Sequence, residues 1–352
     1  MAAESLLDAR RLVIRGLNWI GDAVMSLPTI HNIRKALPET FLAVHAPAWS
    51  AGLYEICPAV DRVILTSEKR FFSEFKEAKK LKAEKFDAAL ILPNSFRSAL
   101  APALAHIPGR WGYNTDTRFP LLTNKVPRPK DADSRHTILY YMELLAAAGI
   151  EWADEKFELV LSQQTKEEAE EIIVSRGARP GSLKIGLSPG AAWGPSKRWP
   201  AERFAAAAKQ LIGNLGADAL IFGSGKESEL IQDVVEAAGE GAVNLAEAFP
   251  QLRHLAASIA GCRLLITNDS GPMHIAASLG VPVVALFGPT DEQRSGPWGL
   301  GERAVVVKRA MDCQPCYNPL CRLQVHPCMM EIEVEEVVAV AETLLKRESA
   351  SS

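Results

Sequence analysis

The sequence predicts an α/β protein made of two doubly wound, Rossmann-like domains, each a mostly parallel sheet covered by helices on both faces. Short segments rich in Val, Ile, Leu and Ala alternate with longer amphipathic stretches through both halves of the chain, as such sheets require. The chain has 352 residues, more than one hydrophobic core usually serves, and its 48% hydrophobic share can fill two cores. We therefore expect two similar domains facing a central cleft, with ligands at the carboxyl ends of the strands.

The strands are expected at the most apolar of these segments. In the first half they cover residues 11–15, 41–45, 62–65 and 87–92, and in the second half 184–187, 218–222, 242–245, 263–266 and 281–287. A polar stretch with Gly and Pro at 175–182 is the expected linker, and 332–347 is the expected final helix. The predicted domains are thus 1–178 and 179–331, followed by a helix and tail at 332–352.

The charge of the chain excludes some partners. The formal net charge is −3 and the pI is about 6.2, so we expect no overall attraction to nucleic acid or to an anionic membrane. No apolar run approaches the roughly 20 residues that cross a bilayer, and the N-terminus lacks the basic start and apolar stretch of a signal peptide. The sequence therefore predicts a cytoplasmic protein in which any basic site is local.

Residues 264–274 form the most informative segment. An apolar strand ends there in small polar residues and opens directly into a helix, with Pro272 suited to the first helical position. The first N–H groups of a helix lack intrahelical partners, so the Ser270 hydroxyl and the Gly271 backbone would face a phosphate. The alternative is an ordinary capped helix. A second candidate anion loop at 188–200 favours the ligand, and two such loops suggest a diphosphate.

The turn after the first predicted strand, residues 16–28, contains Gly16, Gly21 and Asp22. Asp22 lies at or near the start of a helix, which places a carboxylate at the lip of the expected cleft; the alternative is a helix N-cap. The glycines do not match the Gly-x-Gly-x-x-Gly fingerprint of dinucleotide binding, because the third glycine is absent. A nicotinamide enzyme is therefore disfavoured.

Four of the six cysteines crowd together near the end of the chain, with His326 beside the last: Cys313, Cys316, Cys321 and Cys328. Their spacing is compatible with zinc, but it lacks the paired Cys-x2-Cys knuckles of common structural sites. The favoured interpretation is a compact, Pro-broken loop with small buried thiols. Cys57 and Cys262 lie in apolar surroundings and are predicted core residues.

Five segments together resemble glycosyltransferase family 9: residues 18–26, 93–100, 196–200, 268–274 and the cysteine loop beginning at 312–316. The resemblance runs from about residue 11 to about residue 345. It implies the two-domain GT-B fold and inverting transfer of L-glycero-D-manno-heptose from ADP-L-glycero-D-manno-heptose to the lipopolysaccharide inner core. Within the family, the first segment and the Cys-x-Pro-Cys loop lean towards the second heptosyltransferase, with heptosyl-Kdo2-lipid A as acceptor.

The resemblance also implies roles for single residues. Inversion needs a base on the acceptor hydroxyl, and Asp22 matches the base proposed for the family. Lys197 matches the lysine that contacts the diphosphate and would stabilise departing ADP, although an isolated loop lysine is usually solvated. Asp269 would orient its loop by accepting backbone N–H bonds, and His274 has the alternative of a core histidine. The donor-binding candidates are Ala192, Lys197, Lys226, Asp269, Ser270, Gly271 and His274.

The implied acceptor is a lipid-anchored saccharide with carboxylates and phosphates, which arginine side chains bind well. The expected acceptor-binding residues are Asn94, Ser95, Arg97, Arg118 and Arg135. A lysine-rich run at 76–85 would hold the enzyme peripherally at the cytoplasmic face of the inner membrane, although such runs are more often solvated helix faces. The basic donor site replaces a divalent ion, so no metal or cofactor is expected, and the oligomeric state stays open.

Three other functions fit parts of these observations. A sister heptosyltransferase, the first or the third, would use the same donor on another core position. A GT-B nucleotide-sugar epimerase would act on the donor without an acceptor. A non-catalytic module that binds a nucleotide sugar or zinc would be supported mainly by the cysteine loop.

Overall fold

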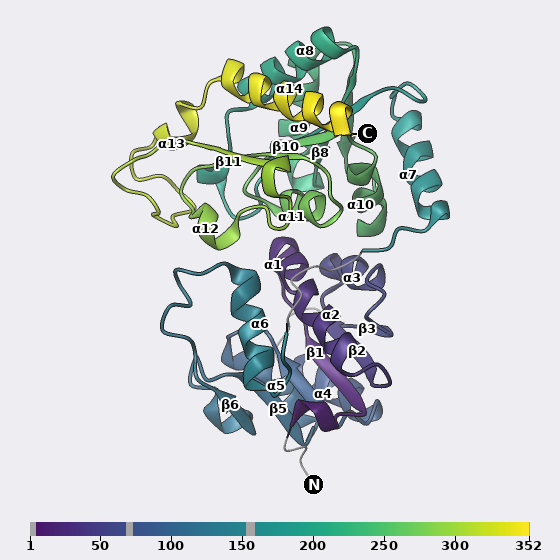
Figure 1. The fold of residues 1–352 in the computed structure, drawn as a ribbon, viewed down its shortest axis with the longest axis vertical. Helices are drawn as coiled ribbons and strands as arrows, with labels where there is room; N and C mark the ends of the chain where they lie inside the picture. Colours follow the sequence, from purple (N-terminus) through teal and green to yellow (C-terminus); the bar gives the residue numbers. More distant parts are fainter. Residues whose placement is uncertain (1–4, 68–72, 153–158, 352) are drawn as a thin grey trace. The chain divides into compact units, whose positions relative to one another are not determined.

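The computed structural model describes residues 5–67, 73–152 and 159–351, and the chain divides into an N-terminal unit, Met1–Val160, and a C-terminal unit, Leu161–Ser352 (Figure 1). Each unit contains a six-stranded sheet in which all paired strands run parallel. The predicted fold class, two doubly wound α/β domains, is therefore confirmed.

The sheet of the N-terminal unit has the order β3-β2-β1-β4-β5-β6. The chain adds β2 and β3 on one side of β1 and then returns to add β4, β5 and β6 on the other. The order therefore reverses between β1 and β4, and the carboxyl ends of these two strands are where such a sheet binds ligands. The strands are β1 (Arg11–Arg15), β2 (Phe41–Ala46), β3 (Arg62–Leu65), β4 (Ala88–Ile91), β5 (Gly109–Tyr113) and β6 (Asn124–Val126).

Helices cover both faces of this sheet. Helices α4 and α5 pack together on one face, and α1, α2, α3 and α6 pack on the other (Figure 1). Val13, Ala43 and Ala89 of the sheet join Leu81 and Phe86 in the core beneath α4 and α5. The helices are α1 (Ile20–Met25), α2 (Leu27–Ala36), α3 (Ala48–Glu55), α4 (Ser73–Ala83), α5 (Phe96–Leu104) and α6 (Thr137–Ala147).

The sheet of the C-terminal unit repeats this topology with the order β12-β11-β10-β7-β8-β9. Its order reverses between β7 and β10, which pair directly with Ser188 opposite Thr267. The loops that leave these two strands are the two predicted anion segments. The strands are β7 (Lys184–Ser188), β8 (Asp218–Gly223), β9 (Ala242–Ala246), β10 (Leu264–Asn268), β11 (Val283–Phe287) and β12 (Ala304–Lys308).

Helices α8, α9 and α14 cover one face of the second sheet, while α7, α10 and α11 lie on the other (Figure 1). Helix α8 ends at Leu215 and is capped by Gly216, whose φ of 61° is left-handed and favours glycine. The helices are α7 (Gln163–Ser175), α8 (Ala201–Leu215), α9 (Ser228–Ala238), α10 (Leu252–Ala260), α11 (Gly271–Ser278), α12 (Glu292–Ser295), α13 (Pro327–Met330) and α14 (Val334–Ser351).

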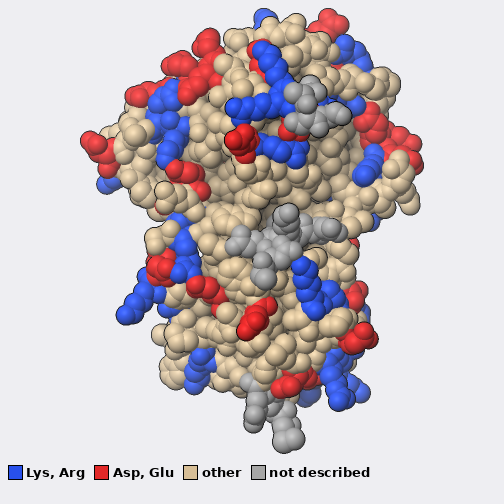
Figure 2. All heavy atoms as spheres, in the orientation of Figure 1, with Lys and Arg blue, Asp and Glu red and all other residues tan. Residues whose placement is uncertain are grey.

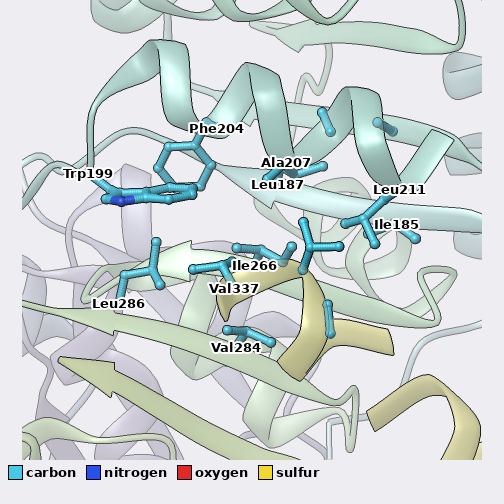
Figure 3. Close-up of a cluster of buried hydrophobic side chains, with 14 of the residues drawn as sticks. Ile185, Leu187, Trp199, Phe204, Ala207, Leu211, Ile266, Val284, Leu286 and Val337 are labelled. Carbon is cyan, nitrogen blue, oxygen red and sulfur yellow. The ribbon is translucent and has the colours of Figure 1, made fainter. Parts of the chain in front are cut away.

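The core beneath α8 is shown in Figure 3. Side chains of β7, β10 and β11 meet α8 and Val337 of α14, and all of those labelled are almost completely buried. Trp199 lies at one end of this core against Phe204, with ring centroids 4.9 Å apart. This arrangement anchors the end of the loop after β7 in the interior of the unit.

The nine predicted strands are all present, and three further strands, β5, β6 and β12, were not predicted. The units divide after Val160 and not at the expected boundary of 178, because α7 packs on α10 and belongs to the C-terminal unit. The helix expected at 332–347 is α14, which packs on α8 and so belongs to this unit as well.

The surface carries charges of both signs, as the low net charge predicts, and the helices show no candidate for crossing a membrane among the described residues. On the face drawn in Figure 2, Lys and Arg side chains lie among Asp and Glu side chains. Within the described ranges, every helix is too short or too polar to cross a bilayer.

Candidate functional site

The two anion segments of the C-terminal unit are tied together by Asn268, the last residue of β10. Its side-chain amide donates to the Pro189 carbonyl at 2.7 Å, and its Oδ1 accepts the Trp199 backbone N–H at 3.0 Å. Asn268 is completely buried. One side chain therefore fixes both ends of the loop after β7 against the start of the helix after β10.

Lys197, in the first of these segments, pairs with Asp269 in the second. Its Nζ is 2.5 Å from Oδ2 of Asp269, and the Thr290 hydroxyl donates to the same oxygen at 2.6 Å. The Lys197 side chain is 13% exposed and that of Asp269 only 4%. Lys197 Nζ also lies 5.1 Å from the centre of the Trp193 ring. The Asp269 carboxylate and the Trp193 ring therefore fix the position of the Lys197 ammonium group, which is slightly more exposed than the carboxylate.

Asp269 differs from its predicted role. The side-chain bonds described above come from Lys197 and Thr290, whereas the prediction had it accept backbone N–H groups. Thr290 follows β11, and the sequence prediction assigned it no role. A polar residue just past a strand that neighbours β10 was the available signal, but using it requires the strand order.

Helix α11 begins at Gly271, with Ser270 as the N-cap and Pro272 in its first turn. The Ser270 side chain makes no capping hydrogen bond and lies 3.2 Å from the Thr267 hydroxyl. The ordinary cap that was the alternative is therefore not formed by this hydroxyl, which leaves the helix start suited to an anion. His274, four residues into the helix, is 5% exposed, and this burial fits the alternative of a core histidine.

The turn after β8 carries Lys226 in a short 3-10 helix, Gly225–Glu227, and its side chain is exposed. Neighbouring Glu227 accepts the Ser224 backbone N–H at 3.0 Å and its hydroxyl at 2.7 Å. Glu227 therefore caps its own turn. Ala192 lies exposed in a turn of the loop after β7, where only its backbone can contact a ligand.

In the N-terminal unit, Asp22 is the third residue of α1, directly after the loop that leaves β1. Trp19 holds the N-cap position, so Asp22 is not the cap residue that the alternative required. The carboxylate is partly buried. Burial raises the pKa of Tyr54 and Tyr141, and the charge of Asp22 adds to both rises, so these two tyrosines are its neighbours.

Side chains of α3 hold the loop between β1 and α1. The Tyr54 hydroxyl accepts the Leu17 N–H at 3.3 Å, and the Ser50 hydroxyl donates to the Leu17 carbonyl at 3.2 Å. The Trp49 indole N–H donates to the Asn18 carbonyl at 2.6 Å. Three hydrogen bonds to side chains of α3 therefore fix the loop that precedes α1, and so help to fix the position of Asp22.

The predicted acceptor residues after β4 lie at the start of α5. Ser95 is the N-cap and accepts the Ser98 N–H at 3.3 Å. Asn94 accepts the Tyr140 hydroxyl at 2.9 Å, and Arg97 pairs with Glu74 of α4. Asn94, Ser95 and Arg97 are all exposed beside the point where the sheet order reverses.

Arg118 and Arg135 are less exposed than these three residues, and their guanidinium groups also contact the protein itself. Arg118 is completely buried and donates to the Tyr113 carbonyl at 2.8 Å and the Ser98 hydroxyl at 3.1 Å. Burial lowers its pKa to about 10. Arg135 pairs with Asp131 and Glu143. We therefore assign Arg118 to the fold of the N-terminal unit.

The candidate metal ligands of the chain are an acidic triplet and the cysteines. The chain has an Asp-x-Asp triplet, but Asp131 pairs with Arg135 and Asp133 with Arg128. Among residues 5–67, 73–152 and 159–351, no three His, Cys, Asp or Glu side chains already have the arrangement of a metal site. All six cysteines are free thiols, and Cys57 and Cys262 are buried, which confirms their prediction as core residues.

Fold and site together define a class of protein. The chain forms two doubly wound α/β units, and in one of them a lysine and the start of a helix meet where the sheet order reverses. Such a site suits the diphosphate of a nucleotide sugar. These are the features of a GT-B glycosyltransferase. The profile of glycosyltransferase family 9 (heptosyltransferase) matches residues 75–326, and the chain belongs to this family.

Similar proteins agree with this assignment. The lipopolysaccharide heptosyltransferase 2 of Salmonella typhimurium is 31% identical, over 96% of this chain and 99% of the relative. The structure of the Escherichia coli ADP-heptose lipopolysaccharide heptosyltransferase II superposes with a TM-score of 0.82 at 30% identity, over 97% of this chain and 99% of that one. A family 9 glycosyltransferase from Veillonella parvula gives 0.83 at 29% identity, over 97% and 98%.

Proposed function

We propose that this protein transfers L-glycero-D-manno-heptose from ADP-heptose to the first heptose of the lipopolysaccharide inner core, with inversion at the anomeric carbon. The observation that carries the proposal is the Lys197–Asp269 pair beside the open start of α11, in a chain similar throughout to heptosyltransferases 2. A fixed cation and the N–H groups at a helix start stabilise the negative charge that develops on a departing diphosphate.

The donor side of the reaction falls to the C-terminal unit. We assign the diphosphate to Lys197, the Ser270 hydroxyl and the Gly271 and Ala192 backbone N–H groups. The remaining donor-binding candidates are Lys226, exposed in the turn after β8, and His274, buried in α11. Because Lys197 and the helix start supply the positive charge, transfer is proposed to need no divalent ion at the diphosphate, and rates without added Mg²⁺ should equal those with it.

The acceptor side falls to the N-terminal unit. Asp22 is proposed as the base that takes the proton from the attacking hydroxyl. Asn94, Ser95, Arg97 and Arg135 are proposed to bind the acceptor, heptosyl-Kdo2-lipid A, with Arg97 and Arg135 exchanging their present carboxylate partners for those of the saccharide. The enzyme would work in the cytoplasm at the inner membrane, with the lysines of α4 towards anionic lipid.

The test is a transfer assay with ADP-heptose and lipopolysaccharide cores that end after no, one or two heptoses. We expect ADP release and a product one heptose larger only with the one-heptose core, and an inverted anomeric centre in that product. Release with another core instead would identify a sister heptosyltransferase. Isomerisation of the donor without any acceptor would overturn the transferase and identify an epimerase.

A further inference from the structure

The cysteine loop brings its four thiols to one small cavity. Cys313, Cys316 and Cys321 lie on the loop between β12 and α13, and Cys328 lies in α13. All four line the same cavity, together with His326, Gln314 and Ser196. No described role in donor or acceptor binding uses these thiols.

Hydrogen bonds hold this loop against the residues that directly follow β11. The Cys316 N–H donates to the Pro289 carbonyl at 3.0 Å, and the Gln314 side chain donates to the Gly288 carbonyl at 2.6 Å. Gly288 leaves room for α13, since a Cβ there would lie 3.2 Å from the Cys328 sulfur. The thiols are thus gathered by the folded loop and not merely by their spacing in the sequence.

We propose that these four cysteines form a tetrahedral thiolate site for a first-row transition-metal ion of the zinc type. Four sulfur ligands favour Zn²⁺ or a single iron ion over harder ions such as Mg²⁺. The side chains rotate into the cavity on binding, and each ligating thiol releases its proton to solvent. His326 lines the same cavity and is the reserve ligand when one thiol is removed.

The proposed site has a structural consequence for the donor loop. The Ser196 hydroxyl donates to the Asn318 carbonyl at 2.5 Å, and the Ser196 N–H donates to the Pro319 carbonyl at 3.2 Å. Asn318 and Pro319 lie between the second and third cysteines, and Ser196 directly precedes Lys197. The metal therefore acts as a positioning element for Lys197, and it does not touch the reacting atoms.

The first experiment measures metal in the full-length protein, purified under reducing conditions. We expect about one equivalent of zinc or iron per chain by mass spectrometry of the elements. The double variant Cys316→Ser/Cys321→Ser should lose it, while Cys57→Ala, a buried cysteine outside the loop, should keep it. Metal-free protein that also fails to take up added Zn²⁺ would overturn the proposal, as would retention of the metal by the double variant.

The second experiment does not depend on variants that fold poorly. Wild-type protein stripped of metal and loaded with Co²⁺ should show thiolate-to-cobalt charge transfer and the strong visible bands of a tetrahedral site. Weak octahedral bands would contradict it, and so would a mass two hydrogens lower that reveals a disulfide in the loop. Stripping should also weaken ADP binding about 10-fold, the effect of misplacing one charged contact.

These results separate the site from the proposed function. Metal content and the cobalt spectrum are independent of heptose transfer, so they stand even when the acceptor assignment fails. An unchanged ADP affinity after stripping would overturn the positioning role alone.

Discussion

Lys197 and Asp269 form an ion pair with Nζ 2.5 Å from Oδ2, and the same oxygen accepts the Thr290 hydroxyl at 2.6 Å. The pair places a cation beside the start of α11 and also neutralises a carboxylate that would repel a diphosphate. The two charges therefore have opposite effects on ADP, which makes them separable by mutation.

Lys197→Ala should weaken ADP binding about 10-fold or more, because it removes one charged contact and exposes the diphosphate to unpaired Asp269. The double variant Lys197→Ala/Asp269→Asn should bind ADP more tightly than Lys197→Ala alone. Calorimetric titration with ADP measures both. Lys209→Ala, on the exposed face of α8, is the matched control and should bind as wild type. Equal affinities of the single and double variants would argue against the role given to Asp269.

Asp22→Asn should keep the affinity for ADP and lower turnover by roughly 100-fold or more, since an amide cannot accept the acceptor proton. Steady-state transfer assays and ADP titration separate the two effects. Asp233→Asn, on the exposed side of α9, removes the same charge elsewhere and should leave turnover unchanged. Wild-type turnover in Asp22→Asn would remove the assigned base.

Gly194 and Gly213 differ in the space around their Cα atoms, so the same substitution by alanine can be compared at both positions. A Cβ on Gly194 would lie 2.7 Å from both the Cβ and the carbonyl oxygen of Pro319, whereas one on Gly213 would meet nothing within 4 Å. Gly194→Ala should therefore destabilise the protein by about 1–3 kcal/mol and weaken ADP binding, because backbone must move. Gly213→Ala, within α8, should stabilise it by up to about 1 kcal/mol. Thermal unfolding measures both, and similar midpoints for the two variants would contradict the close approach.

His45 and Glu77 predict a dependence of stability on pH. Their side chains are 2.5 Å apart and both are buried, and among the described residues His45 Nδ1 has no hydrogen-bond partner. Burial lowers the pKa of His45 and nearby Arg15 and Lys80 add to this, while the hydrogen bond and charge of Glu77 only partly oppose it. Burial alone would raise the pKa of Glu77, but hydrogen bonds from His45 and Ser67 lower it to about 2.

The lowered pKa values of His45 and Glu77 both make the folded protein less stable as the pH falls. Because the pKa of His45 is lowered in the folded chain, the unfolded chain binds more protons below about pH 6.5. The free energy of unfolding therefore decreases as the pH is lowered below that value, by at most about 1.4 kcal/mol per pH unit. The Glu77 contribution is complete above about pH 4.5 and is lost as the pH falls towards 2. Urea unfolding of the full-length wild-type protein should give a lower free energy of unfolding at about pH 5.5 than at about pH 7. His45→Asn keeps a donor for Glu77 without titrating, and an equal loss in that variant would contradict this assignment.

The central strands were predictable because they are continuous apolar runs. The strands β5 and β6 were not, since Gly109–Tyr113 contains two glycines and Asn124–Val126 has three residues at the sheet edge. Their pairing is decided by the neighbouring strand. The valines of β12 did carry a strand signal, which the sequence prediction passed over.

The same distinction applies to the site. Local order around Lys197, Ser270 and Gly271 could be predicted because strand, turn and helix follow one another in the sequence. The roles of Asn268 and Thr290 could not, because they depend on which strands are neighbours in the sheet. Arg118 was chosen for its charge, and only the fold reveals that its guanidinium is enclosed by carbonyl groups.

Trp199 gives the loop after β7 a fixed end, since its indole N–H donates to the Ile332 carbonyl at 2.9 Å and its backbone N–H donates to Asn268. A loop without such an anchor would lose conformational entropy worth about 1–2 kcal/mol per residue when it closes around a ligand. Here that ordering is completed when the polypeptide folds. Nucleotide capture by this half of the molecule should consequently be a rapid, nearly rigid docking event, whose selectivity depends on shape already present before the ligand arrives.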